Sequence, residues 1–373
     1  MFINRGLFIA KATAFCALLL FTFSYTARAL IINPYYETNV TENANAAQFE
    51  ASFAVAVQTI EQLYTNPITI NISVFWGTSG TNNPFSGGIG LGASYMTAVS
   101  SSYSQIVSKM SSSRKTAVQT NAVASLPGSD PSPSGSLWYV PRAEAKALGI
   151  IASDSSNDGF VGFTTNYDFN FAATNRAGNF DDFDFIGVAE HEITEVMGRV
   201  NFGLDTASNY VPYDLFRFTN SGGRSMSYND DGVYFSINDG TNNLKNYDPP
   251  EDNEDIQDWA WPSSPPDSFD ASAINDNEDT LSYPDLVAMN ILGYDLNYAA
   301  PIQMAQQSGA NKIQLTFTNV TGMAYGLIET TNASTAIANW NTLGTPTEAP
   351  AGYYQFTDTH ATNSARFYSV ILQ

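Results

Sequence analysis

Two residues that can bind a metal ion, His191 and Glu195, lie four positions apart in the segment GVAEHEITEVMGRVNFGLD (residues 187–205). On a helix this spacing holds both side chains on one face, one turn apart, as a metal site requires. Glu192 is rotated from that pair by one residue, so its carboxylate can reach a metal-bound water without binding the metal. The pattern therefore predicts His191 and Glu195 as metal ligands and Glu192 as the catalytic general base.

The sequence leaves the third protein ligand open. Asp205 is the first candidate, because a carboxylate oxygen is a competent zinc ligand. Asn201 is a poorer candidate, since its amide oxygen suits harder ions. The only other histidine, His360, lies near the C-terminus. We therefore predict a zinc ion held by His191, Glu195 and Asp205.

The apolar residues around this motif follow the period of a helix. They form one stripe, and His191 and Glu195 point to the other side. Gly198 then allows the helix to stop and the chain to turn back. The stripe consists of Ile186, Ala189, Ile193, Val196 and Val200.

The spacing resembles that of the metzincin clan of zinc proteases, whose pattern is H-E-x-x-H-x-x-G-x-x-H. His191, Glu192 and Gly198 match this pattern, whereas Glu195 and Asn201 stand at the two remaining ligand positions. A longer resemblance, from about Leu30 to Asn297, is to a family of secreted bacterial metalloproteases. It is carried by the motifs AEAKALG, YDLFRFT, VYFSINDG and LSYPDLVAMNILGYD.

This resemblance implies an α/β (α+β) metzincin-like catalytic domain over residues 30–298. It also implies a zinc-dependent endopeptidase whose substrate is a protein or peptide. The competing hypothesis is a catalytically inactive relative that acts as a surface adhesion protein or binds carbohydrate or protein. A chance match of a glutamate-rich surface helix is the third alternative.

The first 29 residues have the features of a secretory signal peptide. Arg5 and Lys11 flank an apolar stretch, and small residues at Ala27 and Ala29 predict cleavage after residue 29. The only cysteine, Cys16, lies in this segment, so the mature chain has no thiol for disulfides or metal binding. The prediction is an exported protein, extracellular or periplasmic.

The charge of the chain excludes two classes of partner. The formal net charge is −21, and removal of the signal peptide leaves 12 basic and 36 acidic residues, a net charge of −24. Such a chain repels nucleic acid and anionic lipid. No other run is long and apolar enough to span a bilayer, so we expect no membrane insertion after the signal is removed.

Alternating apolar and polar residues in the last part of the chain predict a separate module. A linker is expected over residues 299–312, and short strands separated by Gly, Asn and Pro predict a β-sandwich over residues 313–373. Residues 237–258 are rich in Asp and Asn, which is typical of a solvated acidic loop. The alternative for this segment is a calcium site.

Overall fold

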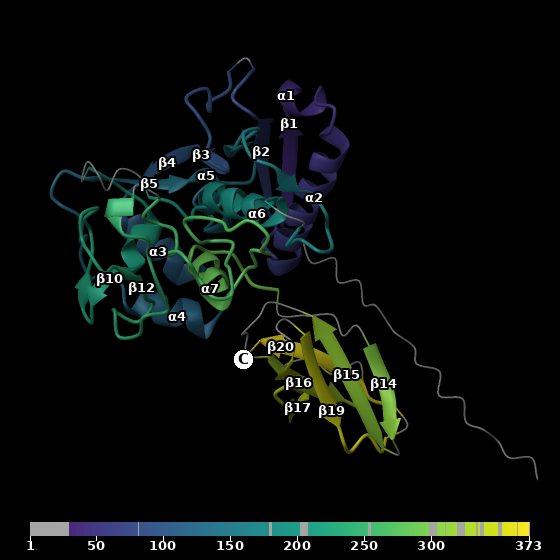
Figure 1. The fold of residues 1–373 in the computed structure, drawn as a ribbon. Coiled ribbons are helices and arrows are strands. Elements are labelled where there is room, and N and C mark those ends of the chain that lie inside the picture. Colours follow the sequence, from purple (N-terminus) through teal and green to yellow (C-terminus); the bar gives the residue numbers. More distant parts are fainter. Residues whose placement is uncertain are drawn as a thin grey trace, which may run out of the picture.

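The computed structural model describes two stretches of the chain (Figure 1). The first is residues 30–297 apart from 81, 179–180, 202–207 and 253–254. The second is residues 304–372 apart from 310, 319–324, 333–334, 336–338, 350–352 and 364. The predicted signal peptide and the first five residues of the predicted linker, 299–303, lie outside them.

A four-stranded sheet forms the N-terminal part of the larger unit. Three of its strands are parallel, and the edge strand β3 runs antiparallel to β6. The parallel strands are rich in Ile, Val and Phe, as expected where helices cover a sheet. The strand order is β1 (Ile31–Tyr36), β2 (Thr69–Trp76), β6 (Gly159–Phe163) and β3 (Gly92–Met96).

An aromatic core joins two helices to this sheet. Helix α2 (Ala46–Leu63) contacts α6 (Phe185–Val196), which also contacts β3 and β6. The ring of Phe185 lies 4.7 Å from that of Phe49 and 4.8 Å from that of Phe163, measured between centroids. These buried rings fix the start of α6 against the sheet, so the helix that carries the predicted motif is rigidly placed.

The remainder of the larger unit is built from short elements. The helices are α1 (Thr38–Thr41), α3 (Tyr103–Ser113), α4 (Ala117–Ala124), α5 (Arg142–Ala147), η2 (Pro212–Phe216), η3 (Pro250–Asp252) and α7 (Tyr283–Ile291). One small sheet has the order β4 (Ala98–Ser101), β5 (Leu137–Pro141) and β9 (Asn209–Tyr210). Another has the order β11 (Gly223–Arg224), β10 (Arg217–Asn220), β12 (Tyr234–Phe235) and β13 (Lys245–Asn246), and β7 (Phe169–Asn170) pairs with β8 (Phe183–Asp184).

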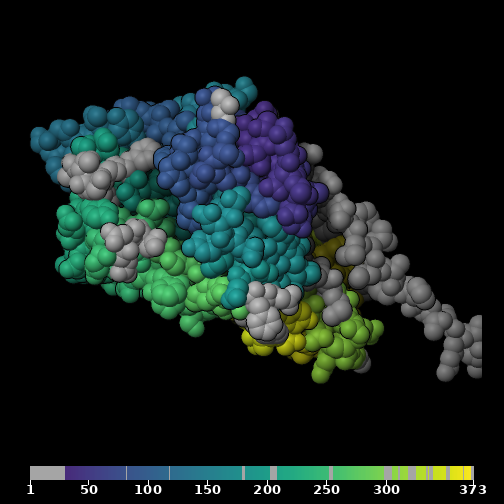
Figure 2. Space-filling view, turned by 45° about the horizontal axis from the view of Figure 1, so that its top comes forward, coloured from purple at the N-terminus to yellow at the C-terminus, as the bar shows by residue number. Residues whose placement is uncertain are grey.

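The C-terminal strands form a lobe of their own, coloured yellow-green in Figures 1 and 2. Phe317 and Tyr325, which lie in different sheets of this lobe, have ring centroids 5.4 Å apart, so the two sheets contact each other. The strand β14 falls in the segment predicted as linker. One sheet has the order β14 (Met304–Gly309), β15 (Lys312–Thr318), β19 (Tyr353–Asp358) and β18 (Thr347–Glu348), and the other β17 (Asn341–Gly344), β16 (Tyr325–Thr330) and β20 (Phe367–Leu372).

The structure confirms a mixed α/β fold, with seven α-helices and several small sheets in the described part of the chain. None of the described helices combines the length and the apolar composition that a membrane crossing needs.

Two charged residues of the AEAKALG motif are fully buried on α5. Lys146 is paired with Asp158, with 2.6 Å between Nζ and Oδ2. Glu144 is different, because neither of its carboxylate oxygens has a hydrogen-bond partner. Burial raises the pKa of Glu144 well above its usual range, and the nearby Asp214 carboxylate raises it further.

Glu144 should therefore make the stability of the fold depend on pH. The unfolded chain ionises this group near its ordinary pKa while the folded chain keeps it protonated. The contribution of Glu144 to the free energy of unfolding is thus complete at low pH. As the pH rises from the unfolded pKa towards the folded pKa, the free energy of unfolding falls by about 1.4 kcal/mol per pH unit. We expect Glu144→Gln to be more stable relative to the native chain at pH 8 than at pH 5, as measured by urea unfolding. Glu42→Gln at an exposed position is the control, and an equal change for both variants would contradict the prediction.

Candidate metal centre

The start of α6 is fixed by a network around Asp184. The Asp184 side chain caps the helix by accepting a hydrogen bond from the Ile186 backbone N–H at 3.2 Å. It also accepts bonds from the guanidinium of Arg176 and from the backbone N–H of Asp279. The structure confirms a helix at this motif, but the helix ends at Val196, so Val200 of the predicted apolar stripe lies after it; Gly198, with φ +125°, lies in the turn that follows the helix. A Cβ at this glycine would press on the buried Glu144 side chain.

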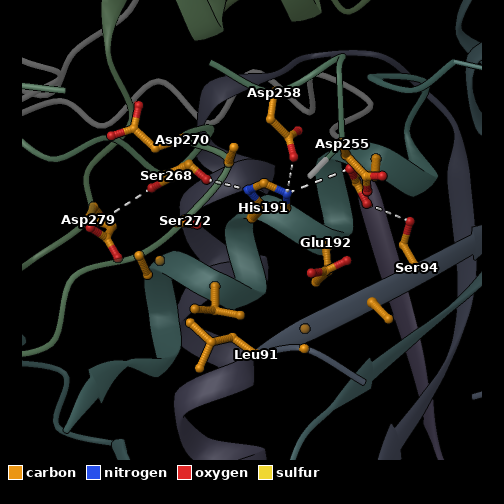
Figure 3. Close-up of a pocket in the computed structure, with 18 of the residues that line it drawn as sticks. Leu91, Ser94, His191, Glu192, Asp255, Asp258, Ser268, Asp270, Ser272 and Asp279 are labelled. Atoms are coloured by element: carbon orange, nitrogen blue, oxygen red, sulfur yellow. Dashed lines mark hydrogen bonds and ion pairs between the residues drawn. The ribbon is translucent and has the colours of Figure 1, made fainter. Parts of the chain in front are cut away.

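His191, Glu195 and Asp258 converge at the C-terminal half of α6. Figure 3 shows the side chain of Asp258 pointing toward the ring of His191. Each offers one ligand atom, and the three atoms lie within 4.8 Å of one another. His191 Nε2 is 3.6 Å from Glu195 Oε1 and 3.5 Å from Asp258 Oδ2. One imidazole nitrogen and two carboxylate oxygens at this spacing are a donor set that zinc accepts.

The orientation of the His191 ring follows from its other nitrogen. Nδ1 lies 2.8 Å from the backbone carbonyl oxygen of Ser268. Because a carbonyl can only accept, Nδ1 carries the proton in this contact. In the neutral ring the lone pair is then on Nε2, which faces Glu195 and Asp258. A hydrogen bond of this kind is typical of metal-binding histidines.

The Glu195 carboxylate is held on both oxygens. Ser94 Oγ on the edge strand donates to Oε2 at 2.8 Å, and Gln257 Nε2 donates to Oε1 at 2.9 Å. Asn201, which stands at the third histidine position of the metzincin pattern, donates through its amide to Gln257. Asn201 therefore acts on the site through Gln257, as a positioning residue for Glu195.

Arg199 joins the two acidic members of the group. Its side chain has no exposed surface, pairs with Asp258, and lies 3.6 Å from Glu195 Oε1. It also donates to the backbone oxygen of His191 at 3.2 Å and covers the ring of Phe269. The guanidinium thus balances part of the negative charge of both carboxylates and fixes their positions.

The charges around His191 favour a cation at its Nε2. Burial and Arg199 both oppose protonation, but the neighbouring Asp258 and Glu195 outweigh them and raise the pKa of His191 well above its usual range. Burial would raise the pKa of Glu195, yet bonding to His191 and the charges of His191 and Arg199 lower it to about 2. A proton or a metal ion can satisfy this negative potential.

Asp258 is held in place by the residue that follows it. Trp259 is fully buried, and its indole N–H donates to Asp285 on α7 at 2.7 Å. The backbone N–H of Trp259 donates to the Phe269 carbonyl oxygen at 2.8 Å. The motif LSYPDLVAMNILGYD therefore contributes to the site indirectly, because its Asp285 anchors the strand-like segment that carries Asp258.

Glu192 lies beside this group and lines the same pocket. It is buried, and its Oε2 atom has no hydrogen-bond partner. Burial raises the pKa of Glu192 well above its usual range, and the Glu195 carboxylate raises it further. A Cβ at Gly92 on β3 would overlap the Glu192 carboxyl group, so glycine is what lets the edge strand pass over it.

The pocket has a volume of about 580 Å³. Residues of β3, the face of α6 and the loops between Asp255 and Asp279 line it. Asp255 stands at its rim, where burial and the carboxylates of Glu195 and Asp258 raise its pKa to about 7. The cleft between the edge strand and the helix is therefore strongly acidic.

The structure brings His191, Glu192 and Glu195 together, as predicted, but Asp205 lies outside the described residues. Sequence reasoning missed Asp258, Arg199 and Gln257. The sequence feature that could have pointed to Asp258 and Gln257 is their position in the acidic segment 237–258, the end of which contacts His191. The calcium site suggested for that segment stays a prediction. His360 lies in the C-terminal lobe beside Thr359.

Comparison of the chain with protein-family models, with curated proteins and with solved structures finds no match. The assignment of a function therefore depends on the geometry of this pocket.

Proposed function

We propose that this chain is a secreted zinc-dependent endopeptidase with a metzincin-like catalytic domain. The observation that carries the proposal is the convergence of His191 Nε2, Glu195 and Asp258 beside Glu192, a buried carboxylate with an unpartnered oxygen. Three ligands, a base next to them and an open cleft are the parts that metal-assisted hydrolysis needs.

The residues present fit a zinc ion. His191 is oriented by Ser268, Glu195 by Ser94 and Gln257, and Asp258 by Arg199. Such outer contacts hold ligands in the geometry that a metal requires. When bound, zinc supplies Lewis acidity that makes a water acidic and polarises the scissile carbonyl.

Glu192 is the residue that transfers the proton from the attacking water to the leaving group. Its place beside the three ligand atoms, with one carboxylate oxygen unpartnered and directed at the pocket, suits a group that takes a proton from the attacking water and then protonates the leaving amine. The pocket keeps the carboxylate out of bulk water, since Glu192 is 5% exposed. We assign Glu192 as the catalytic residue, and Arg199 and Gln257 as positioning residues.

The edge strand supports a peptide as the substrate. In the described residues, β3 pairs with β6 on one side and with no strand on the other. Residues Gly92 to Tyr95 of β3 also line the pocket. An extended peptide can therefore add to β3 through backbone hydrogen bonds and place one of its peptide bonds over His191.

The remaining parts of the proposal come from the sequence. The signal-like segment before Leu30 and the absence of cysteine after it support export. The two contacting antiparallel sheets after Met304 support a β-sandwich module that accompanies the catalytic unit.

Metal analysis tests the proposal most directly. We expect the mature protein purified without chelator to hold about one zinc per chain, and to regain it after chelation and dialysis against zinc. His360→Ala should bind zinc equally well, whereas His191→Ala should bind none. Failure to hold zinc, manganese or calcium after reconstitution would contradict the proposal.

A further inference from the structure

A second polar group faces the pocket one helical turn before the metal ligands. Gly187, His191 and Glu195 follow one another at four-residue spacing along α6. Asp279 packs against Gly187, where a Cβ would lie 2.7 Å from the Cβ of Asp279. One turn of helix rises about 5.4 Å, so Asp279 stands between about one and two residues of an extended peptide away from His191.

The Asp279 side chain is buried and has no partner in the described part of the chain. The residue is 4% exposed and lines the pocket. Its backbone N–H donates to Asp184, and its backbone oxygen accepts from Ser268 and Arg176. Among the described residues, none forms a hydrogen bond or an ion pair with its carboxylate, although the charge of the neighbouring Arg176 partly offsets that of the carboxylate.

The charges near Asp279 are mostly negative. Arg176, whose charge acts on Asp279, is already paired with Asp184 at 2.7 Å, and Lys245 is paired with Asp267 at 2.9 Å. Burial, followed by the charges of Asp184 and Asp270, raises the pKa of Asp279 to about 8. The acidic groups at this end of the pocket thus outnumber the cations, and a bound cation would offset their repulsion.

The spacing of these carboxylates argues against a second metal ion. In the described residues, only His191, Glu195 and Asp258 bring three ligand atoms within 4.8 Å of one another. Asp267 and Asp270 are also occupied, by Lys245 and Ser263 respectively. A single unpartnered carboxylate in a cavity instead suits the ammonium or guanidinium group at the end of a long side chain.

We propose that Asp279 binds a lysine or arginine side chain of the peptide substrate, next to the bond that is cleaved. The apolar lining of the pocket includes Tyr167, Phe183 and Val188, against which the aliphatic part of such a side chain can pack. The substrates of this site are then peptides with a basic residue at one fixed position beside the scissile bond. This inference depends on the proposed peptidase function.

The test measures binding without cleavage, with the zinc-loaded full chain carrying Glu192→Gln. Fluorescently labelled peptides that differ only in lysine, norleucine or glutamate at successive positions are titrated by fluorescence polarisation. At one position lysine should bind at least about tenfold more tightly than norleucine, since a charge-assisted hydrogen bond in a desolvated site has that effect. Glutamate should bind more weakly than norleucine.

The added substitution Asp279→Asn should abolish most of the preference for lysine. Glu278→Gln removes the same charge from the neighbouring, exposed residue and should leave the preference intact. Equal binding of lysine and norleucine peptides at every position, or no binding of any peptide, would overturn the subsite. A lysine preference in a chain whose native form cleaves no peptide would support the subsite and contradict the proposed hydrolysis.

Discussion

Glu192→Gln should reduce the rate of peptide hydrolysis by about a hundred- to ten-thousandfold while the zinc content stays unchanged. The amide has nearly the shape of the carboxyl group, so the packing against Gly92 should persist. It cannot accept a proton from water, and proton transfer is the role that the position of Glu192 supports. The measurement is kcat/KM on a cleavable peptide together with zinc analysis of the same sample.

Two results would contradict this assignment of Glu192. Loss of zinc in the variant would make the side chain a ligand, and unchanged hydrolysis with zinc retained would remove it from the reaction. Glu42→Gln makes the same chemical change at an exposed position outside the pocket and should alter neither quantity. A difference in its activity would indicate a general effect of lost charge.

The sequence predicted the parts of the site that are local in the chain. His191, Glu192 and Glu195 lie on one helix, and their relative positions follow from the helical period alone. The flanking elements were also recovered, because α2 and β2 have strong apolar periodicity. The apolar spacing of residues 43–64 indicates a helix, and α2 spans Ala46–Leu63; the alternation of residues 67–77 indicates a strand, and β2 spans Thr69–Trp76.

The remainder of the site could not be predicted, because it is brought together by long-range contacts. Asp258 and Gln257 lie more than sixty positions from His191 and Glu195 in an acidic segment with no regular spacing. Nothing in that composition distinguishes Asp258 from the other acids around it. Its position depends on Trp259 reaching Asp285, a contact between two side chains in different motifs.

The burial and pairing of the positively charged Arg199 could not be predicted from the local sequence either. A basic residue just after a helix is typical of a solvated surface, where it interacts with the helix C-terminus. In the structure Arg199 is fully buried and pairs with Asp258. The local sequence carries no sign of this burial, since the partner is distant in the chain. The two carboxylates of the group, Glu195 and Asp258, are thereby balanced by a cation outside the HExxE motif.

The third ligand can be identified by comparing two aspartates. We expect Asp258→Asn to weaken zinc binding by more than about a hundredfold, because even loss of a contact behind a ligand costs ten- to a hundredfold. Asp205→Asn should bind zinc like the native chain. Asparagine is chosen at position 258 because it keeps the shape of the aspartate side chain. Complete removal of the Asp258 side chain would leave the buried Arg199 without a partner.

Zinc affinity is measured by competition with a chromogenic chelator, and circular dichroism of each variant shows whether it has folded. The opposite pattern, with zinc lost in Asp205→Asn and kept in Asp258→Asn, would place Asp205 at the metal and leave Asp258 as the partner of Arg199 alone. If Asp258→Asn does not fold, Asp205→Asn alone still tests whether Asp205 binds the metal. Retention of zinc in Asp205→Asn excludes Asp205 as a ligand. Asp258, which lies 3.5 Å from the histidine nitrogen, would then be the remaining candidate for the third ligand among the described residues.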